Sequence, residues 1–314
     1  MRRVACGLAA AGLLLGTGSA MACAPGRAAA DAPVALVFSG GGAKSAWEAG
    51  VAVALVEGGA PIRVAAGSSA GALNAAMLAD GRLEHLERVW RSVTREQVYR
   101  LRASVFLSGL LPGWLTLLAL DGAGSLLDPG PLRQLLEASL DLPRVRASPL
   151  RVVVVATDLA RGQRRVFDNA TLTVDALLAA GAVPGAFPPV EIAGEALVDG
   201  GLVGRAPVLE ALETGVPLGR ALILLSSARE APGPPPTRLR AILESAFELT
   251  MVHQMGRDAE LAALRHPTVD VQVLAPSKPL GVRPLDFEPE ALGRLFDLGR
   301  ADGRACLEAL RGGR

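Results

Sequence analysis

The apolar positions of this chain fall into short continuous runs separated by helical stretches. Such runs occur at residues 32–40, 61–67, 150–159, 164–168, 220–227 and 269–276. Apolar runs of this length, rich in β-branched residues and bounded by turn residues, are typical of strands buried on both faces. Helical patterns, including residues 45–57 and 70–78, lie between most of these runs. The alternation predicts an α/β fold, a three-layer α/β/α sandwich with a mostly parallel central sheet.

A long helix is predicted near the carboxyl end. The sequence PGPPP at residues 232–236 can form neither a helix nor a central strand, so it predicts a surface loop. Apolar residues then recur at steps of three and four, which predicts a helix with one buried face. These residues are Leu239, Ile242, Ala246, Leu249, Val252, Met255, Ala259 and Ala262. His253 borders this face, and we interpret it as a packed or surface histidine.

Residues 104–120 form a strongly apolar segment that is interrupted by Pro112 and Gly113 and contains Trp114. One interpretation is a pair of short core helices joined by a turn. The alternative is a lipid-facing cap over a site, because exposed apolar patches often mark membrane or ligand contacts.

Residues 1–22 have the layout of an export signal. Two arginines precede an uncharged apolar run, and small residues stand at Ala20 and Ala22. One alternative is an uncleaved membrane anchor, because the apolar run is nearly long enough to span a bilayer. Another is lipidation of Cys23 after cleavage just before it, since AMAC resembles a bacterial lipobox with Ala20 where leucine is usual. We therefore expect an exported protein that is secreted, periplasmic or membrane-anchored through Cys23.

Composition and charge limit the possible classes of protein and of binding partner. The chain has 314 residues, of which 50% are hydrophobic and 20% charged, so it can bury one large core. Loss of Arg2 and Arg3 with the signal takes the formal net charge from +1 to −1, which does not suggest binding to nucleic acid. After the signal we expect a short linker at residues 23–31 and a single catalytic domain at residues 32–314.

Few cysteines and histidines remain for metal or redox chemistry. Cys6 lies in the signal, Cys23 would be the new terminus, and Cys306 lies in the folded body, so we expect no disulfide framework and no metal cluster. The histidines His85, His253 and His266 have no metal-ligand spacing. We therefore expect neither a metal nor a cofactor.

The sequence GSSAG at residues 67–71 matches the G-x-S-x-G pattern, with Ser69 at its centre. Between a strand and a helix, this pattern is typical of a nucleophile elbow, in which Gly67 and Gly71 permit a sharp turn that exposes the serine hydroxyl. The helix amino terminus and the amide of Ala70 would favour negative charge beside that hydroxyl.

A glycine-rich loop, FSGGGAKS at residues 38–45, follows the first predicted strand. It departs from the P-loop pattern because Ala43 precedes Lys44, and Ser45 stands where the dinucleotide fingerprint requires glycine. Its exposed amides instead suit the oxyanion of a tetrahedral acyl-transfer intermediate. We interpret Gly40, Gly41 and Gly42 as oxyanion donors.

A carboxylate is the predicted base for this serine. Asp199 ends a short apolar strand and is followed by Gly200 and Gly201, which places it at a strand end, where sites in such sheets collect. His253 and His266 would fit the chain order of a Ser-Asp-His triad, but neither lies in a recognisable strand-end loop.

Together these motifs resemble the patatin-like phospholipases. The resemblance rests on G-G-G-x followed by a basic residue, on G-x-S-x-G and on a later D-G-G, in that order, and on AAGAVPGAFPPV at residues 179–190. It implies that Ser69 is the nucleophile, that Asp199 completes a Ser-Asp dyad, and that the glycine amides form the oxyanion hole. Two departures are Lys44-Ser45 in place of Arg-Gly, and Arg205 where the family often has asparagine shortly before proline.

The resemblance implies an exported acyl-ester hydrolase of the phospholipase A or lysophospholipase type. Its partner would be a lipid or lysolipid ester at a membrane surface, and not nucleic acid. One alternative is a catalytically silent lipid-binding or envelope-scaffold protein with the same fold. Another is a thioesterase or protease that uses the same serine.

Overall fold

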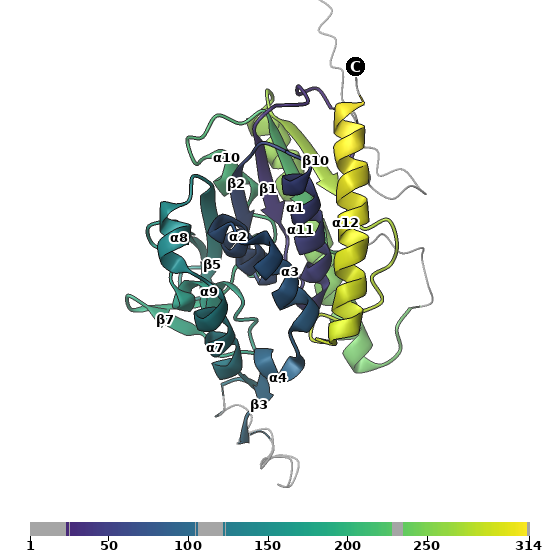
Figure 1. Cartoon of the computed structure of the whole chain (residues 1–314). Helices are drawn as coiled ribbons and strands as arrows, with labels where there is room; N and C mark the ends of the chain where they lie inside the picture. Colours follow the sequence, from purple (N-terminus) through teal and green to yellow (C-terminus); the bar gives the residue numbers. More distant parts are fainter. Residues whose placement is uncertain are drawn as a thin grey trace, which may run out of the picture.

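The computed structural model describes residues 23–24, 26–103, 105, 122, 124–227 and 235–312. Their centre is one eight-stranded sheet with the order β10-β9-β1-β2-β5-β8-β7, and β6 pairs with β5 outside this path. The five strands β10, β9, β1, β2 and β5 are parallel, whereas β6, β7 and β8 add antiparallel pairs at one side. The predicted mixed, mostly parallel sheet is therefore confirmed (Figure 1).

The strands begin and end close to the predicted apolar runs. They are β1 (Val34–Phe38), β2 (Ile62–Gly67), β5 (Arg151–Asp158), β6 (Gln163–Asp168), β7 (Val190–Ile192), β8 (Glu195–Asp199), β9 (Arg220–Leu224) and β10 (Asp270–Leu274). A separate two-stranded pair consists of β3 (Arg100–Leu101) and β4 (Leu127–Asp128). The sequence did not predict β3, β4 or β7, because each has only two or three residues and carries no periodic signal.

Helices cover both faces of the sheet. Figure 1 views the molecule from the face covered by α1 (Ser45–Glu57), α2 (Ala70–Asp80), α3 (Leu83–Ser92) and α12 (Pro289–Arg311). The opposite face is covered by α10 (Val208–Leu212) and α11 (Leu239–Arg265). The other helices are α4 (Arg95–Val98), α7 (Gly130–Ser139), α8 (Leu142–Ala147), α9 (Val174–Ala180), and the 3₁₀ turns η1 (Gly42–Lys44) and η2 (Gly200–Leu202).

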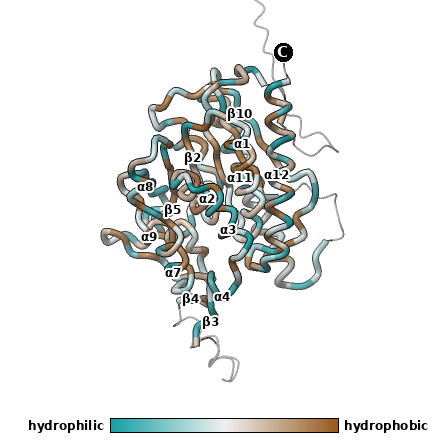
Figure 2. The backbone as a smooth tube through the Cα atoms, in the orientation of Figure 1, coloured by the Kyte–Doolittle hydropathy of each residue, from teal (hydrophilic) through white to brown (hydrophobic). Residues whose placement is uncertain are grey.

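Alternation along β1 shows how the three layers form. Leu36 and Phe38 belong to the core cluster that includes α1, α2 and α12, whereas Ala35 and Val37 belong to the cluster that includes α10 and α11. Successive strand residues point to opposite faces, so a strand covered on both sides must be apolar at every position. In Figure 2 the hydrophobic colour is accordingly concentrated in the interior, around β2, β5 and α1.

Helix α11 corrects one prediction. Its carboxyl-terminal half is buried as expected, with Met255, Ala259 and Ala262 in the core. In its amino-terminal half, however, Ile242 is 44% exposed and Leu249 is 60% exposed. The spacing of apolar residues correctly predicted a helix with an apolar face, but spacing carries no information on whether a second element covers that face along its whole length.

Several predictions concern parts of the chain outside the described residues. The predicted signal at residues 1–22 lies outside the described residues, and so does the apolar segment at residues 104–120, except for Val105. Of the predicted proline-rich loop, Pro235 and Pro236 are described, and both are exposed. Among the helices that the structure does describe, none is both long and apolar enough to cross a bilayer.

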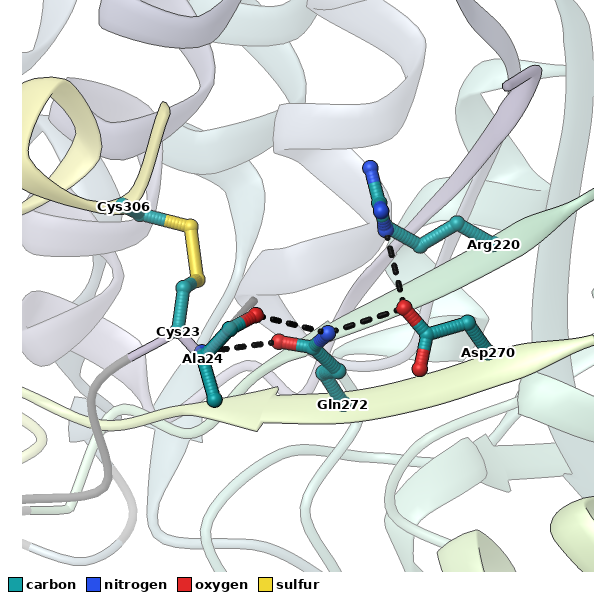
Figure 3. Close-up of a disulfide and its surroundings, with 6 residues drawn as sticks. All are labelled: Cys23, Ala24, Arg220, Asp270, Gln272 and Cys306. Atoms are coloured by element: carbon teal, nitrogen blue, oxygen red, sulfur yellow. Dashed lines mark hydrogen bonds and ion pairs between the residues drawn. A yellow bond between two sulfur atoms is a disulfide. The ribbon is translucent and has the colours of Figure 1, made fainter. Parts of the chain in front are cut away.

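The segment predicted as a linker at residues 23–31 is fastened to the body of the protein. Cys23 forms a disulfide with Cys306 of α12, which corrects our expectation that the cysteines form no covalent link (Figure 3). The pairing could not be read from the sequence because 283 positions separate the two residues. The Gln272 side chain also pairs with the backbone N–H and carbonyl of Ala24, each at 3.2 Å. The predicted linker is therefore part of the folded domain.

Candidate active site

Ser69 lies at a strained turn between β2 and α2. Its φ angle is +53°, a conformation that residues other than glycine rarely adopt. A side chain on Gly67 would lie 2.3 Å from the Gly71 carbonyl oxygen, and one on Gly71 would lie 2.7 Å from the Phe38 carbonyl oxygen. Both glycines are therefore required for the close packing of this turn. Its geometry is that of a nucleophile elbow, with Ser69 directly before the first turn of α2.

The glycine loop between β1 and α1 lies beside this serine. Gly40, Gly41 and Gly42 have φ angles of +75°, +134° and +60°, which only glycine adopts without strain. A side chain on Gly40 would lie 2.8 Å from the Cβ atom of Ser69. The two loops are adjacent because β1 and β2 are parallel neighbours, with Phe38 opposite Gly67 in the register.

The predicted set of oxyanion donors changes in one respect. The N–H of Gly40 donates to Oε1 of Glu48 at 3.1 Å, so this amide is not directed at the cavity. Gly41, Gly42 and Ala70 do line the cavity that contains Ser69. Within the described part of the chain, no acceptor takes the N–H of Gly41 or Gly42. The donors that the geometry leaves for an oxyanion are therefore Gly41, Gly42 and Ala70.

Asp199 is at the carboxyl end of β8 and lines the same cavity as Ser69. It is 5% exposed, and its Oδ1 atom accepts the N–H of Gly201 at 2.7 Å. A side chain on Gly200 would lie 2.1 Å from the Val155 carbonyl oxygen, so the D-G-G sequence is a requirement of packing against β5. The strand-end position predicted for Asp199 is the one observed.

The environment of Asp199 makes it a stronger base than an exposed carboxylate. Burial raises the pKa of Asp199 to about 6, although the Gly201 amide, the Ser69 hydroxyl and the charge of Arg205 all act to lower it. Its Oδ2 atom has no partner of good hydrogen-bond geometry among the described residues. The Ser69 hydroxyl is thus close enough to influence the carboxyl group electrostatically, while one carboxylate oxygen stays open to a proton.

Two charged residues that the motifs did not assign to the site lie behind the glycine loop. Glu48 of α1 is fully buried, and its Oε1 atom accepts from the Ser39 hydroxyl at 3.0 Å as well as from Gly40. Burial raises the pKa of Glu48 to about 8. Arg205 donates to the Gly40 carbonyl oxygen at 3.1 Å and lines the cavity. In the sequence, Arg205 is marked by its place shortly before Pro207, where it departs from the family pattern. No motif marks Glu48.

The cavity at this site has a volume of about 650 Å³. Its polar lining residues include Ser69, Asp199, Lys44 and Arg283. Most of the remaining wall is apolar and comes from α2, α3, α7 and the segment before α12. The apolar residues include Leu73, Met77, Val89, Trp90, Val93, Leu132, Leu135, Leu280, Val282 and Phe287. Volumes of this order are usual for small-molecule sites.

None of the three histidines is part of this cavity wall as far as the described residues define it. His253 is exposed on α11, and His266 follows the end of that helix. His85 lies 3.0 Å from the Ser139 carbonyl oxygen through its Nε2 atom. In the described part of the chain, no group of His, Cys, Asp and Glu side chains is arranged to hold a metal ion.

Comparison with solved structures finds distant similarities. Solved structures that resemble the chain include VipD from Legionella pneumophila, at a TM-score of 0.48 and 16% identity, covering 88% of this chain and 66% of that one. Human GIVD cytosolic phospholipase A2 gives a TM-score of 0.46 and 14% identity, covering 90% of this chain and 60% of that one.

Comparison of sequences identifies relatives and the family of the chain. Uncharacterized NTE family proteins of Mycobacterium tuberculosis and Mycobacterium bovis are 32% identical over 183 residues, which is 58% of this chain and 46% of the relatives. The chain thus matches about half the length of these relatives. The family model described as patatin-like phospholipase matches residues 36–212, which include the glycine loop, the Ser69 elbow and Asp199. The chain belongs to the patatin-like phospholipase family.

Proposed function

We propose that this protein is a serine acyl-ester hydrolase that acts on lipids, of the phospholipase A or lysophospholipase type. The observation that carries the proposal is the arrangement around Ser69. One cavity with largely apolar walls contains Ser69 in a strained conformation and the buried carboxyl group of Asp199, of which one oxygen has no hydrogen-bond partner among the described residues. Loop amides without an acceptor line the same cavity. Membership of the patatin-like phospholipase family supports the same conclusion.

The chemistry follows the usual two steps of nucleophilic catalysis. The Ser69 oxygen attacks the ester carbonyl carbon and its proton passes to Asp199, while the amides of Gly41, Gly42 and Ala70 stabilise the oxyanion. Collapse of this intermediate breaks the bond to the alcohol, which leaves with the proton from Asp199. Water then attacks the acyl-enzyme, with Asp199 again accepting a proton, and releases the fatty acid and the free serine.

The pKa of Asp199 makes a carboxylate feasible as the base. An ordinary aspartate has a pKa near ~4 and is a weak base toward an alcohol. Burial raises the pKa of Asp199 to about 6, so its carboxylate holds a proton more firmly and is still ionised at neutral pH. A catalytic pKa near the working pH is the favourable condition for general base catalysis.

The cavity supports a lipid as the substrate class. Besides Ser69 and the other polar residues, apolar side chains such as Leu73, Trp90 and Leu135 line its wall. Burying the methylene groups of an acyl chain against such a wall contributes about 0.8 kcal/mol each. We infer that the acyl chain lies along these side chains and that the polar head of the lipid remains toward Lys44 and Arg283, at a membrane surface.

We also propose that the protein is exported and that residues 1–22 are its signal. Disulfides form and persist in oxidising compartments, so the bond between Cys23 and Cys306 supports export. The same sulfur of Cys23 cannot be in this disulfide and carry a lipid. The disulfide therefore favours secretion or a periplasmic location over an anchor at Cys23.

The first test is covalent labelling by a fluorophosphonate probe, followed by intact-mass analysis. We expect one adduct on the protein, and none on Ser69→Ala. Loss of the nucleophile should lower hydrolysis of phospholipid vesicles by about 10³-fold or more. Ser92→Ala is the matched control, because this exposed serine bonds only to the Arg88 carbonyl on α3.

Absence of an adduct on folded protein would contradict the proposal and favour a lipid-binding or scaffold protein. An adduct combined with faster turnover of acyl thioesters or peptides than of vesicles would retain the serine nucleophile and reject the lipid substrate.

A further inference from the structure

The peptide unit between Gly40 and Gly41 is flanked by glycine on both sides, so it is free of the side-chain restraint that would fix its orientation. Both residues are glycines with positive φ angles, and glycine crosses between conformations without a side-chain penalty. A rotation of this unit would turn the Gly41 N–H away from its present direction. An oxyanion donor must be held in place before the reaction to be effective. Something in the structure must therefore restrain this peptide.

Hydrogen bonds at the Gly40 carbonyl provide that restraint. Its oxygen accepts from Nη2 of Arg205 at 3.1 Å and from the hydroxyl of Ser226, and the Ser39 hydroxyl lies 3.3 Å from it. A trans peptide is planar, with its C=O and N–H pointing in opposite directions. Since Arg205 and Ser226 hold the Gly40 oxygen on one side, the Gly41 N–H must point to the other. The preceding amide, that of Gly40, is fixed separately by Glu48 at 3.1 Å.

Arg205 is itself held close to both catalytic loops. Its carbonyl oxygen accepts the hydroxyl of Ser68, the residue directly before the predicted nucleophile. A side chain on Gly41 would lie 3.1 Å from Nη2 of Arg205, so the guanidinium packs directly against the loop. Its positive charge acts on the buried carboxyl groups of both Asp199 and Glu48. Arg205 thus contacts the glycine loop and the serine turn and is electrostatically coupled to the base.

We propose that Arg205 is a positioning residue of the hydrolase, which holds the Gly40 carbonyl so that the Gly41 amide stays oriented as an oxyanion donor. The inference rests on the proposed function of Ser69. It assigns a role to the position at which this chain departs from the family, because arginine stands here where asparagine is frequent. The longer guanidinium side chain reaches across to the glycine loop.

The test compares Arg205→Met, Arg205→Lys and Ser226→Ala in the oxidised full-length protein. Methionine keeps much of the apolar length of arginine and removes its donors, and lysine restores a charged donor without the planar fork. Removing one oxyanion-hole donor costs about 10²–10³-fold in kcat. For Arg205→Met we expect kcat to fall by about 10- to 100-fold, with KM changed by less than about threefold.

Three further readouts separate positioning from a structural role. The rate of fluorophosphonate labelling should fall in parallel with kcat, and Arg205→Lys should recover part of both. Ser226→Ala removes the second donor to the same carbonyl, so its effect should be smaller and not additive with that of Arg205→Met. Arg161→Met is the control, because Arg161 is an exposed arginine paired with Asp158 and remote from the loop.

The pH profile provides an independent signature. Arg205, before α10, is the charged group that acts on Asp199, while Lys44 in η1 and Arg283 before α12 line the same cavity, and Glu48 in α1 interacts with Arg205. Arg205 lowers the pKa of Asp199, so its removal should shift the acid limb of kcat/KM to higher pH. A purely structural defect would lower the whole profile without shifting it.

The outcomes distinguish this inference from the proposed function. An active, labelled wild type with Arg205→Met within threefold of it in kcat and labelling would overturn the role of Arg205 and leave the hydrolase intact. A wild type without activity or adduct would overturn both. If Arg205→Met does not fold, the inference depends on Arg205→Lys, and wild-type kcat, labelling rate and acid limb in that variant would overturn the role of the guanidinium group.

Discussion

Two buried carboxyl groups determine the electrostatics of the site at the scale of single residues. Asp199 faces the cavity and Glu48 lies behind the glycine loop, and burial raises the pKa of each, to about 6 and about 8 respectively. At neutral pH Asp199 is therefore largely ionised and Glu48 largely protonated. The two groups can perform different tasks, with Asp199 available as a base and Glu48 as a neutral acceptor for the Gly40 amide.

The base proposed for Ser69 leads to a specific pH dependence. The active form of Asp199 is the carboxylate, so kcat/KM should be level above pH ~7 and fall about tenfold per pH unit below the pKa of about 6. Asp199→Asn should lower activity by about 10³-fold or more, because asparagine cannot accept the proton. A series of kcat/KM values between pH 4 and 9 tests both.

The histidine variants are the control for this profile. The raised pKa of Asp199, about 6, places the acid limb close to the ordinary histidine value of ~6.5. The profile alone therefore does not identify the base. His253→Ala and His266→Ala should keep both the activity and the acid limb, since neither side chain lines the cavity. Loss of activity in either folded variant would replace the dyad by a triad.

At the scale of elements, close packing of α1 against α12 holds the helix that follows the glycine loop. Helix α1 is almost entirely buried, between the sheet and α12. The two helices approach at glycines: a side chain on Gly299 would lie 2.0 Å from the Trp47 carbonyl oxygen, and one on Gly50 would lie 2.1 Å from that of Phe296. Since Glu48 lies on α1, the position of this helix determines where the loop is held.

Gly299→Ala tests this packing. The added methyl group meets backbone atoms that cannot move without shifting a whole helix, so we expect a loss of about 1–3 kcal/mol in the free energy of unfolding. Urea-induced unfolding of the wild type and the variant measures this loss. Gly256→Ala on α11 is the matched control, because nothing lies within 4 Å of the added methyl group and alanine favours a helix by about 1 kcal/mol. Equal effects of the two substitutions would show that α1 and α12 are less closely packed.

At the scale of the whole molecule, the disulfide closes the chain from its amino-terminal end to its last helix. Near the disulfide, Asp270 of β10 accepts from the side chains of Arg220 of β9 and Gln272 (Figure 3). Arg220 also donates to the carbonyl oxygen of Ala28. These contacts join the first described residues to the strands at one side of the sheet. The termini of the folded domain are thus held together on that side.

Cys306→Ser should lower the free energy of unfolding by about 2–5 kcal/mol under oxidising conditions. Reductant should destabilise the wild type by a similar amount and leave the variant unchanged. Protein isolated from its natural compartment should begin near Cys23 and have a mass two hydrogens below that of the reduced chain. A mass increased by a diacylglycerol group, with Cys306 free, would reject the disulfide in favour of lipidation.

The sequence determined most of the sheet and the identities of the site residues. Strand runs buried on both faces are recognisable because every position must be apolar, as in β1 and β5. The glycines around Ser69 and Asp199 are recognisable because only glycine permits those backbone contacts. The contacts themselves join distant residues, such as Gly71 with Phe38 and Gly200 with Val155, but the glycines they require stand in short motifs. Motif and spacing therefore predicted the elbow, the glycine loop and the strand end that carries Asp199.

Only the tertiary structure decided what depends on distant parts of the chain. It assigned the Gly40 amide to Glu48, placed Arg205 on the Gly40 carbonyl, raised the pKa of two carboxyl groups and joined Cys23 to Cys306. It also left Ile242 and Leu249 of α11 exposed, where the apolar face was expected to be covered. Burial, electrostatics and long-range pairing depend on which elements meet in space, and local sequence patterns carry no record of that.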